Sequence, residues 1–211
     1  VRMDEMEYSA EAKKNGWMRH ELVDFDCDGH NELIVETDVM NLFFAPGTGA
    51  HLFELDFKPK AFNLIDTLTR REEGYHRKLL ELAQKRQEQD QSDGVASIHD
   101  ILSAKEEGLE RYLNYDWYRR TSLVDHFLHP QTELEYFARA QYGEQGDFVD
   151  HPYSVQVSQK EKDIIARFAR NGHVWVGDEF VPVYLSKSVT IQPGSGEIRI
   201  RYLLKNNHSK I

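Results

Sequence analysis

The chain has 211 residues, and its 26 lysines and arginines against 36 aspartates and glutamates give a formal charge of −10. This acidic balance argues against unspecific nucleic-acid binding, which needs clustered positive charge, and no apolar run approaches the roughly 20 residues of a membrane-spanning helix. The charged residues 1–16 do not have the pattern of a signal peptide. The single cysteine, Cys27, excludes an internal disulfide and a zinc site with several thiolates, and it fits a reducing, cytoplasmic compartment.

The first stretch, residues 17–69, has the pattern of β-strands. Strands are expected at residues 32–37, 42–45, 51–57 and 63–68, and the sequence Pro-Gly-Thr-Gly after residue 45 is a strong turn signal. Phe53, Leu55 and Phe57 alternate with acidic residues in the third of these strands. This period of two predicts that the three apolar side chains share one buried face.

The second stretch, residues 70–116, is dense in Glu, Gln, Lys and Arg and is expected to be a helical insertion. Apolar residues recur near helical spacing over residues 74–89, which predicts an amphipathic helix. A polar linker at residues 87–94 leads to a second candidate helix, which Ser97 begins and whose apolar stripe ends near Leu113. The charged residues are interpreted as solvated helical faces.

The third stretch, residues 116–211, returns to strands. They are expected at residues 122–128, 134–141, 153–157, 164–170, 173–176, 180–185, 188–191 and 198–204. Asn171-Gly172 and Gly177-Asp178 are predicted to be hairpin turns between them. Many short strands with frequent turn signals indicate a mainly β fold, an antiparallel sandwich with a helical insertion, in one domain that spans residues 1–211.

An acidic loop at residues 24–32 is the sharpest local signal. Three aspartates alternate, a glycine that permits a tight turn follows, and a glutamate comes at the ninth position. Carboxylates this dense repel one another unless a cation neutralises them, and Ca2+ takes 6–8 oxygen ligands. We therefore predict a structural calcium site formed by the side chains of Asp24, Asp26, Asp28 and Glu32 and the backbone carbonyl of His30. The alternative is an acidic turn that binds no metal.

The acidic loop is also the first of several blocks that resemble a known family. The blocks are DFDCDGHNELIVE at residues 24–36, residues 40–46, LFELDFKPKAFNLIDTLTRREEGYH at residues 52–76, SIHDI at residues 97–101 and YDWYRRTSLVDHFL at residues 115–128. Their order and spacing closely resemble the C-terminal β-domain of family 57 glycoside hydrolases, the α-amylase and 4-α-glucanotransferase group. The resemblance is close from residue 17 to residue 128 and looser from residue 153 to residue 204.

The resemblance implies a fold, a galactose-mutarotase-like supersandwich, that agrees with the expected strands. It also implies that an N-terminal (β/α) barrel of the parent chain carries the two catalytic carboxylates, which a retaining mechanism places about 5–5.5 Å apart. The sequence blocks of that barrel are absent from these 211 residues, so the chain is expected to be a non-catalytic fragment. Its expected partners are the catalytic barrel and an α-1,4-glucan, with no nucleic acid and no membrane.

Two polar and aromatic clusters are candidates for contacts with a glucan. A sugar site needs an aromatic face for the apolar side of the ring and polar groups for the hydroxyls. The first cluster supplies Trp117, Arg119, Asp125 and His126, and the second, in a glycine-flanked loop, supplies Asp150 and His151. The alternative readings are packing for Trp117, pairing with a nearby acid for His126, and an ordered surface loop for the second cluster. Trp17 and Trp175 are assigned to the core.

Two other functions stay open at this point. A self-sufficient carbohydrate-binding module would use the aromatic and acidic loops. An enzyme similar to aldose epimerases, built on the same kind of sandwich, would need a histidine acid and a carboxylate base on the concave sheet, with His126 or His151 as the histidine.

Overall fold

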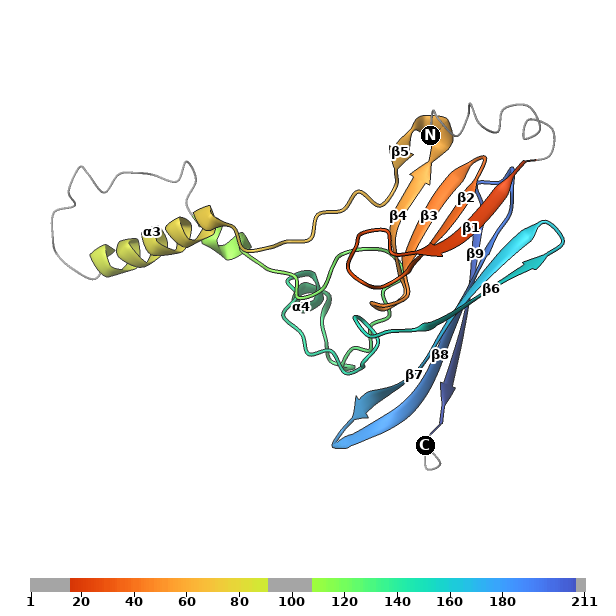
Figure 1. Cartoon of the computed structure of the whole chain (residues 1–211). Helices are drawn as coiled ribbons and strands as arrows, with labels where there is room; N and C mark the ends of the chain where they lie inside the picture. The colour runs from red at the N-terminus through yellow and green to blue at the C-terminus, as the bar shows by residue number, and fades with distance from the viewer. Residues whose placement is uncertain (1–15, 91–107, 208–211) are drawn as a thin grey trace. The chain divides into compact units, whose positions relative to one another are not determined.

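The computed structural model describes residues 16–90 and 108–207, and Figure 1 shows their elements. The chain divides into two compact units. Of the described residues, the first unit holds 16–67, 120–132 and 143–207, and the second holds 68–90, 108–119 and 133–142. The described parts of the predicted helical insertion, residues 70–116, fall within the second unit.

Five strands of the first unit form one antiparallel sheet. They are β1 (Met18–Val23), β2 (Glu32–Thr37), β3 (Met40–Ala45), β4 (His51–Phe57) and β5 (Phe62–Asn63), and each pairs with the next along the chain. The bounds predicted for β2 and β4 are confirmed. Both segments contain the β-branched and aromatic residues that favour strands. The strand expected at residues 63–68 ends early, because the Asn63 side chain accepts a hydrogen bond from the Ile65 amide at 2.9 Å and turns the chain.

Four further strands form a second antiparallel sheet in the same unit. They are β6 (Ser154–Lys160), β7 (Asp163–Val176), β8 (Glu179–Ile191) and β9 (Ile198–Asn206), paired in that order. β7 and β8 make a long twisted ribbon (Figure 1). The predicted turn at Gly177-Asp178 is confirmed, and Gly177 adopts the left-handed φ of 61° that such a turn uses.

The hydrophobic core lies between the two sheets. Phe44 of β3 and Phe168 of β7 are fully buried, and their ring centroids are 5.1 Å apart. The same cluster includes Leu33 and Leu42 from the first sheet and Val189 from the second. Two antiparallel sheets that share one core confirm the predicted mainly β sandwich.

The predicted turn at Asn171-Gly172 is wrong, because β7 runs through both residues without a break. A Cβ on Gly172 would lie 2.3 Å from Asp147 Oδ1 and 2.6 Å from Phe148 Cζ. Glycine is therefore needed for close packing against the preceding loop, and not for a turn. In the same way, the strands expected at residues 180–185 and 188–191 are parts of the single strand β8.

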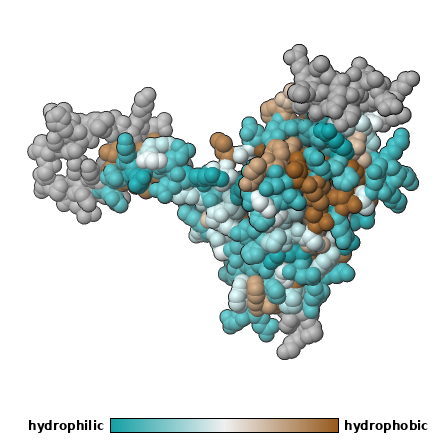
Figure 2. Space-filling model, viewed as in Figure 1, coloured by the Kyte–Doolittle hydropathy of each residue, from teal (hydrophilic) through white to brown (hydrophobic). Residues whose placement is uncertain are grey.

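A β-bulge between β3 and β4 breaks the alternation predicted for residues 51–57. Phe43 pairs with Glu54, but Phe44 pairs with Leu52, so Phe53 has no partner in the register. Phe53 consequently joins a small apolar cluster apart from the main core, whereas Leu55 and Phe57 pack against the main core. Figure 2 shows hydrophobic surface over the region of β2, β3 and β4.

The second unit contains α3 (Gly74–Asp90), a short 3-10 helix η3 (Leu109–Tyr112) and α4 (Leu134–Ala138). α3 confirms the helix predicted at residues 74–89. Most of the helix expected from Ser97 lies outside the described residues. Arg70 binds the Asp116 carboxylate through its amide at 2.8 Å and its guanidinium at 2.6 Å, which joins the two ends of the insertion.

Two expected strands between the insertion and β6 are not strands. Residues 134–138 form α4 because amide-to-carbonyl bonds join residues four apart, such as Phe137 to Glu133 at 3.1 Å. Residues 122–128 pair only through isolated bridges at their two ends. Leu123 there has a left-handed φ of 61°, which interrupts an extended strand.

Candidate functional site

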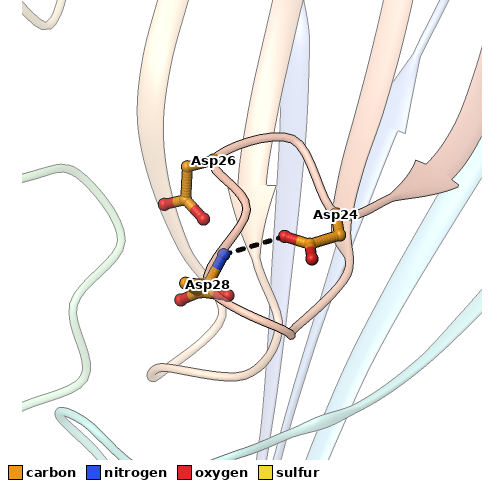
Figure 3. A group of neighbouring side chains, drawn as sticks. All are labelled: Asp24, Asp26 and Asp28. Atoms are coloured by element: carbon orange, nitrogen blue, oxygen red, sulfur yellow. Dashed lines mark hydrogen bonds between the residues drawn. The ribbon is translucent and has the colours of Figure 1, made fainter.

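The acidic loop between β1 and β2 brings three of the predicted calcium ligands together. Carboxylate oxygens of Asp24, Asp26 and Asp28 lie within 4.8 Å of one another, and Figure 3 shows the three side chains on one short loop. The Asp24 carboxylate accepts hydrogen bonds from the amides of Asp28 at 3.0 Å and Gly29 at 3.1 Å, which holds the loop closed. Oxygens this close fit the ligand chemistry of a divalent cation.

The other two predicted ligands are Glu32 and the backbone carbonyl of His30, and the Glu32 carboxylate is not part of this group of three. Glu32 is buried at the start of β2, and its carboxylate accepts a hydrogen bond from the Phe25 amide at 3.0 Å. The His30 amide donates to the Asp28 carboxylate at 2.8 Å. Glu32 therefore helps to shape the loop through the Phe25 amide, and the structure brings three of the four predicted side-chain ligands into one cluster.

A buried ammonium group links three parts of the first unit. Lys187 of β8 is fully buried, and its Nζ donates to the carbonyls of Gly49 at 3.0 Å and Leu123 at 2.7 Å and to Asp125 Oδ2 at 2.9 Å. These acceptors satisfy all three ammonium protons. Burial lowers the pKa of Lys187, and the charge and hydrogen bond of Asp125 oppose that change.

The buried Tyr153 and the half-exposed Tyr202 lie close to this cluster. The Tyr153 hydroxyl donates to Asp125 at 2.7 Å, and burial, followed by the Asp125 charge, raises its pKa far above the ordinary value. Burial and Asp125 also raise the pKa of Tyr202. Asp125, a predicted sugar contact, thus lies in the core, where its carboxylate accepts hydrogen bonds from the protein itself.

The remaining predicted sugar contacts of the first unit lie in two places. His126 Nδ1 is 2.8 Å from Glu144, and that carboxylate also accepts the Phe127 amide at 2.6 Å, so this histidine has an acidic partner. Asp150 and His151 form an exposed pair at 2.9 Å, in the loop before β6. This loop is anchored, because the Gly49 amide donates to the His151 carbonyl at 2.8 Å.

Trp117 and Arg119 belong to the second unit. Trp117 is 46% exposed, and its ring meets those of Tyr118 and Tyr142 edge-on at centroid distances of 5.1 and 6.4 Å. Its neighbour Asp116 is buried under the Arg70 guanidinium, and this hydrogen bond raises the pKa of Arg70. Trp117 is thus half exposed, whereas Asp116 is committed to the fold.

Sequence reasoning missed a group of aromatic residues near the tip of the β7–β8 ribbon. Trp175, assigned to the core, is 49% exposed, and Phe180 opposite it lies 4.8 Å away, centroid to centroid. His173 also stacks on Phe180, with 4.7 Å between the ring centroids. The signal was present in the sequence, because the Gly177-Asp178 turn places Trp175 and Phe180 opposite each other on the same face.

The face of the second sheet that carries these rings is also hollowed. One hollow of about 290 Å³ is lined by Ser154, Gln156, Arg167, Ala169, Asn171 and Tyr184. A second of about 640 Å³ is lined by Ile165, Ser188, Thr190, Arg199, Ile200 and Arg201. Neither of these two hollows has an acidic residue in its lining, so neither offers a carboxylate for acid–base chemistry.

The comparison with known families assigns this two-sheet chain to one family. The chain belongs to the family described as "Alpha-amylase/4-alpha-glucanotransferase, C-terminal", whose model matches residues 24–211. This match confirms the resemblance to the C-terminal domains of α-amylases and 4-α-glucanotransferases. Among residues 16–90 and 108–207, no helix is both long and apolar enough to cross a membrane.

Individual relatives are whole enzymes that are much longer than this chain. It is 35% identical to "Alpha-amylase 1" of Dictyoglomus thermophilum over 92% of its own length and 26% of that protein. It is 32% identical to the 4-alpha-glucanotransferase of Thermococcus litoralis over 91% of its length and 28% of that protein. The crystal structure of the latter aligns with a TM-score of 0.67 and 29% identity over 89% of this chain and 26% of that one. The chain thus spans about a quarter of these relatives.

The buried tyrosine gives the first unit a specific pH dependence. Because the pKa of Tyr153 is raised above 10.0 in the folded protein, its stabilising contribution is full below pH 10 and is lost as the pH rises further. Lys187 has the opposite effect just below pH 10.5. Because its pKa is lowered in the folded protein, this residue makes the free energy of unfolding rise with pH there. We expect the free energy of unfolding of Tyr153→Phe to fall less steeply between pH 10 and 11 than that of the wild type.

The difference in slope has an upper limit of about 1.4 kcal/mol per pH unit, the value for one proton. Urea unfolding at closely spaced pH values measures it. Tyr136→Phe is the matched control, because Tyr136 is half exposed and should keep the wild-type slope. Equal slopes for wild type and Tyr153→Phe would contradict the buried cluster.

Proposed function

We propose that this chain is the non-catalytic C-terminal β-sandwich domain of a family 57 glycoside hydrolase that acts on α-1,4-glucans. In the parent protein it would support a catalytic (β/α) barrel encoded in the same chain. One observation carries the proposal: a match over about nine-tenths of the chain accounts for only about a quarter of each relative. The rest of each relative is long enough to hold the catalytic machinery. A cytoplasmic location belongs to the same proposal.

The chemistry of the described residues supports a non-catalytic role. A retaining glycosidase needs two carboxyl groups about 5–5.5 Å apart on opposite sides of the scissile bond. Asp24, Asp26 and Asp28 are this close, but they share one short exposed loop and cannot enclose a sugar from two sides. Asp125 and Glu144 are engaged by protein donors.

The two alternative functions gain different support. The aldose-epimerase reading needs a histidine free to act as an acid, whereas His126 is held by Glu144 and His151 lies in an exposed loop. The carbohydrate-binding reading is favoured by the exposed aromatic residues Trp117 and Trp175. Carbohydrate binding is compatible with the non-catalytic role.

Activity measurements test the main proposal directly. The 211-residue chain incubated with maltoheptaose is expected to produce no new reducing ends and no longer or shorter glucans, whereas the same chain joined to its parent barrel is expected to do so. Chromatography of the products separates hydrolysis from transfer. Turnover by the chain alone would show that it contains a catalytic centre.

We also propose that the acidic loop binds Ca2+ and joins β1 to β2 without taking part in chemistry. The clustered oxygens of Asp24, Asp26 and Asp28 support this proposal. A ligand that binds only the folded state at 100 times its Kd adds about 2.7 kcal/mol of stability. For a chain of this size, each kcal/mol corresponds to roughly 2–4 °C in Tm.

Thermal unfolding with and without chelator measures this effect. Ca2+ is expected to raise the Tm of the wild type by several degrees, and Asp26→Ala is expected to abolish the rise because it removes one of the three carboxylates. Asp150→Ala, which removes an exposed aspartate outside the loop, is the control and should respond like the wild type. A Tm that does not depend on Ca2+ would exclude the site.

A further inference from the structure

The outer face of the second sheet, defined here as the side of β6–β9 turned away from the core, differs from the inner face in composition. Alternate residues of each strand point to it. From β7 it receives Ile165, Arg167, Ala169, Asn171, His173 and Trp175, from β8 Phe180, Tyr184, Ser186, Ser188 and Thr190, from β6 Ser154, Gln156 and Ser158, and from β9 Arg199, Arg201, Leu203 and Lys205. Hydroxyl, amide, guanidinium and aromatic groups thus share one continuous face.

The polar groups on this face are ordered by hydrogen bonds. Arg167 lies in the middle of the sheet, where its Nε donates to the Ser186 hydroxyl at 3.1 Å and its Nη2 to the Tyr184 hydroxyl at 3.0 Å. Arg167, Tyr184, Gln156 and Asn171 all line the hollow of about 290 Å³. A hollow lined by fixed donors and one aromatic ring has the composition of a small polar ligand site.

The aromatic end of the face adjoins this hollow along the same strands. Trp175 and Asn171 are four residues apart on β7, so they point to the same side about 13 Å from each other at the usual rise of a strand. Trp175 is at the end of the stack of three rings, with half of its surface exposed. An extended ligand can therefore contact the tryptophan and the hollow at once.

The face carries four cationic side chains, Arg167, Arg199, Arg201 and Lys205, and two of the arginines are already bonded to groups of the protein. Arg199 is paired with Glu197 at 2.6 Å, and this pair raises the pKa of the arginine and lowers that of the glutamate. Arg167 is bonded to two hydroxyls. The chain as a whole carries a formal charge of −10, which opposes the approach of a polyanion. Neutral donors, acceptors and aromatic rings complement a chain of sugar units, which alternates hydroxyl groups with apolar C–H faces.

We propose that the outer face of the second sheet binds an α-1,4-linked gluco-oligosaccharide, with Trp175 contacting one sugar and the hollow around Arg167 and Asn171 receiving the hydroxyls of another. The choice of an α-glucan rests on the proposed function. The site is separate from the sugar contacts predicted from the sequence, and in the parent enzyme it would hold long substrates near the catalytic part without acting on the bond that breaks.

Calorimetric titration of the 211-residue chain with maltoheptaose tests the proposal. Trp175→Ala is expected to weaken binding about tenfold, which corresponds to about 1.4 kcal/mol, because it removes the exposed aromatic face. Tyr136→Ala is the matched control: it removes an aromatic residue of similar exposure, 52% against 49%, from the other unit, and it should leave the affinity unchanged. Asn171→Ala, an exposed substitution that keeps the aromatic stack, is expected to weaken binding as well.

Several outcomes would overturn the proposal. These are no binding by the wild type, equal affinities for wild type and Trp175→Ala, loss of binding in Tyr136→Ala alone, or tighter binding of dextran sulfate than of maltoheptaose. If Trp175→Ala fails to fold by circular dichroism, Asn171→Ala decides the result. Product analysis in the same samples keeps the two proposals apart, because cleavage of maltoheptaose contradicts the non-catalytic role, whereas absence of binding contradicts only this site.

Discussion

The packing of the first unit depends on one buried cation. The Lys187 ammonium comes from the second sheet, and its three acceptors come from the turn between β3 and β4 and from the segment of residues 120–132. A buried ion pair adds little net stability, because desolvation cancels most of the attraction, but breaking one leaves an uncompensated charge. Lys187 therefore selects one arrangement of these segments over other packings of the same apolar residues.

This arrangement leaves few acidic groups of the core for chemistry. Asp125 is committed to Lys187 and Tyr153, and Glu144 is committed to His126 and to backbone amides. Arg167, Ser186 and Tyr184 form one hydrogen-bonded group on the outer face of the second sheet. This face is the proposed binding surface, and a supporting role agrees with a domain that matches only a quarter of its enzyme relatives.

Local patterns in the sequence predicted the features that depend on neighbouring residues. β2 and β4 follow from runs of β-branched and aromatic residues, α3 from apolar spacing, and the Asp24–Asp28 cluster from alternation. Long-range contacts decided the rest. Gly172 lies inside a strand because Phe148, far along the chain, packs against it. Lys187 and Gly49 are 138 residues apart, so no local pattern could have paired them, and Trp175 was assigned to the core because its exposed face depends on sheet register.

A double-mutant cycle on Lys187 and Asp125, measured by urea unfolding at pH 7, tests most directly whether this buried pair organises the fold. Lys187→Met and Asp125→Asn are each expected to cost about 3–5 kcal/mol, and the double variant much less than their sum, because neither charge is then left alone. The same cycle on the exposed pair Arg199 and Glu197 should show little coupling. Costs for Lys187 and Asp125 that add to within about 0.5 kcal/mol would contradict the account.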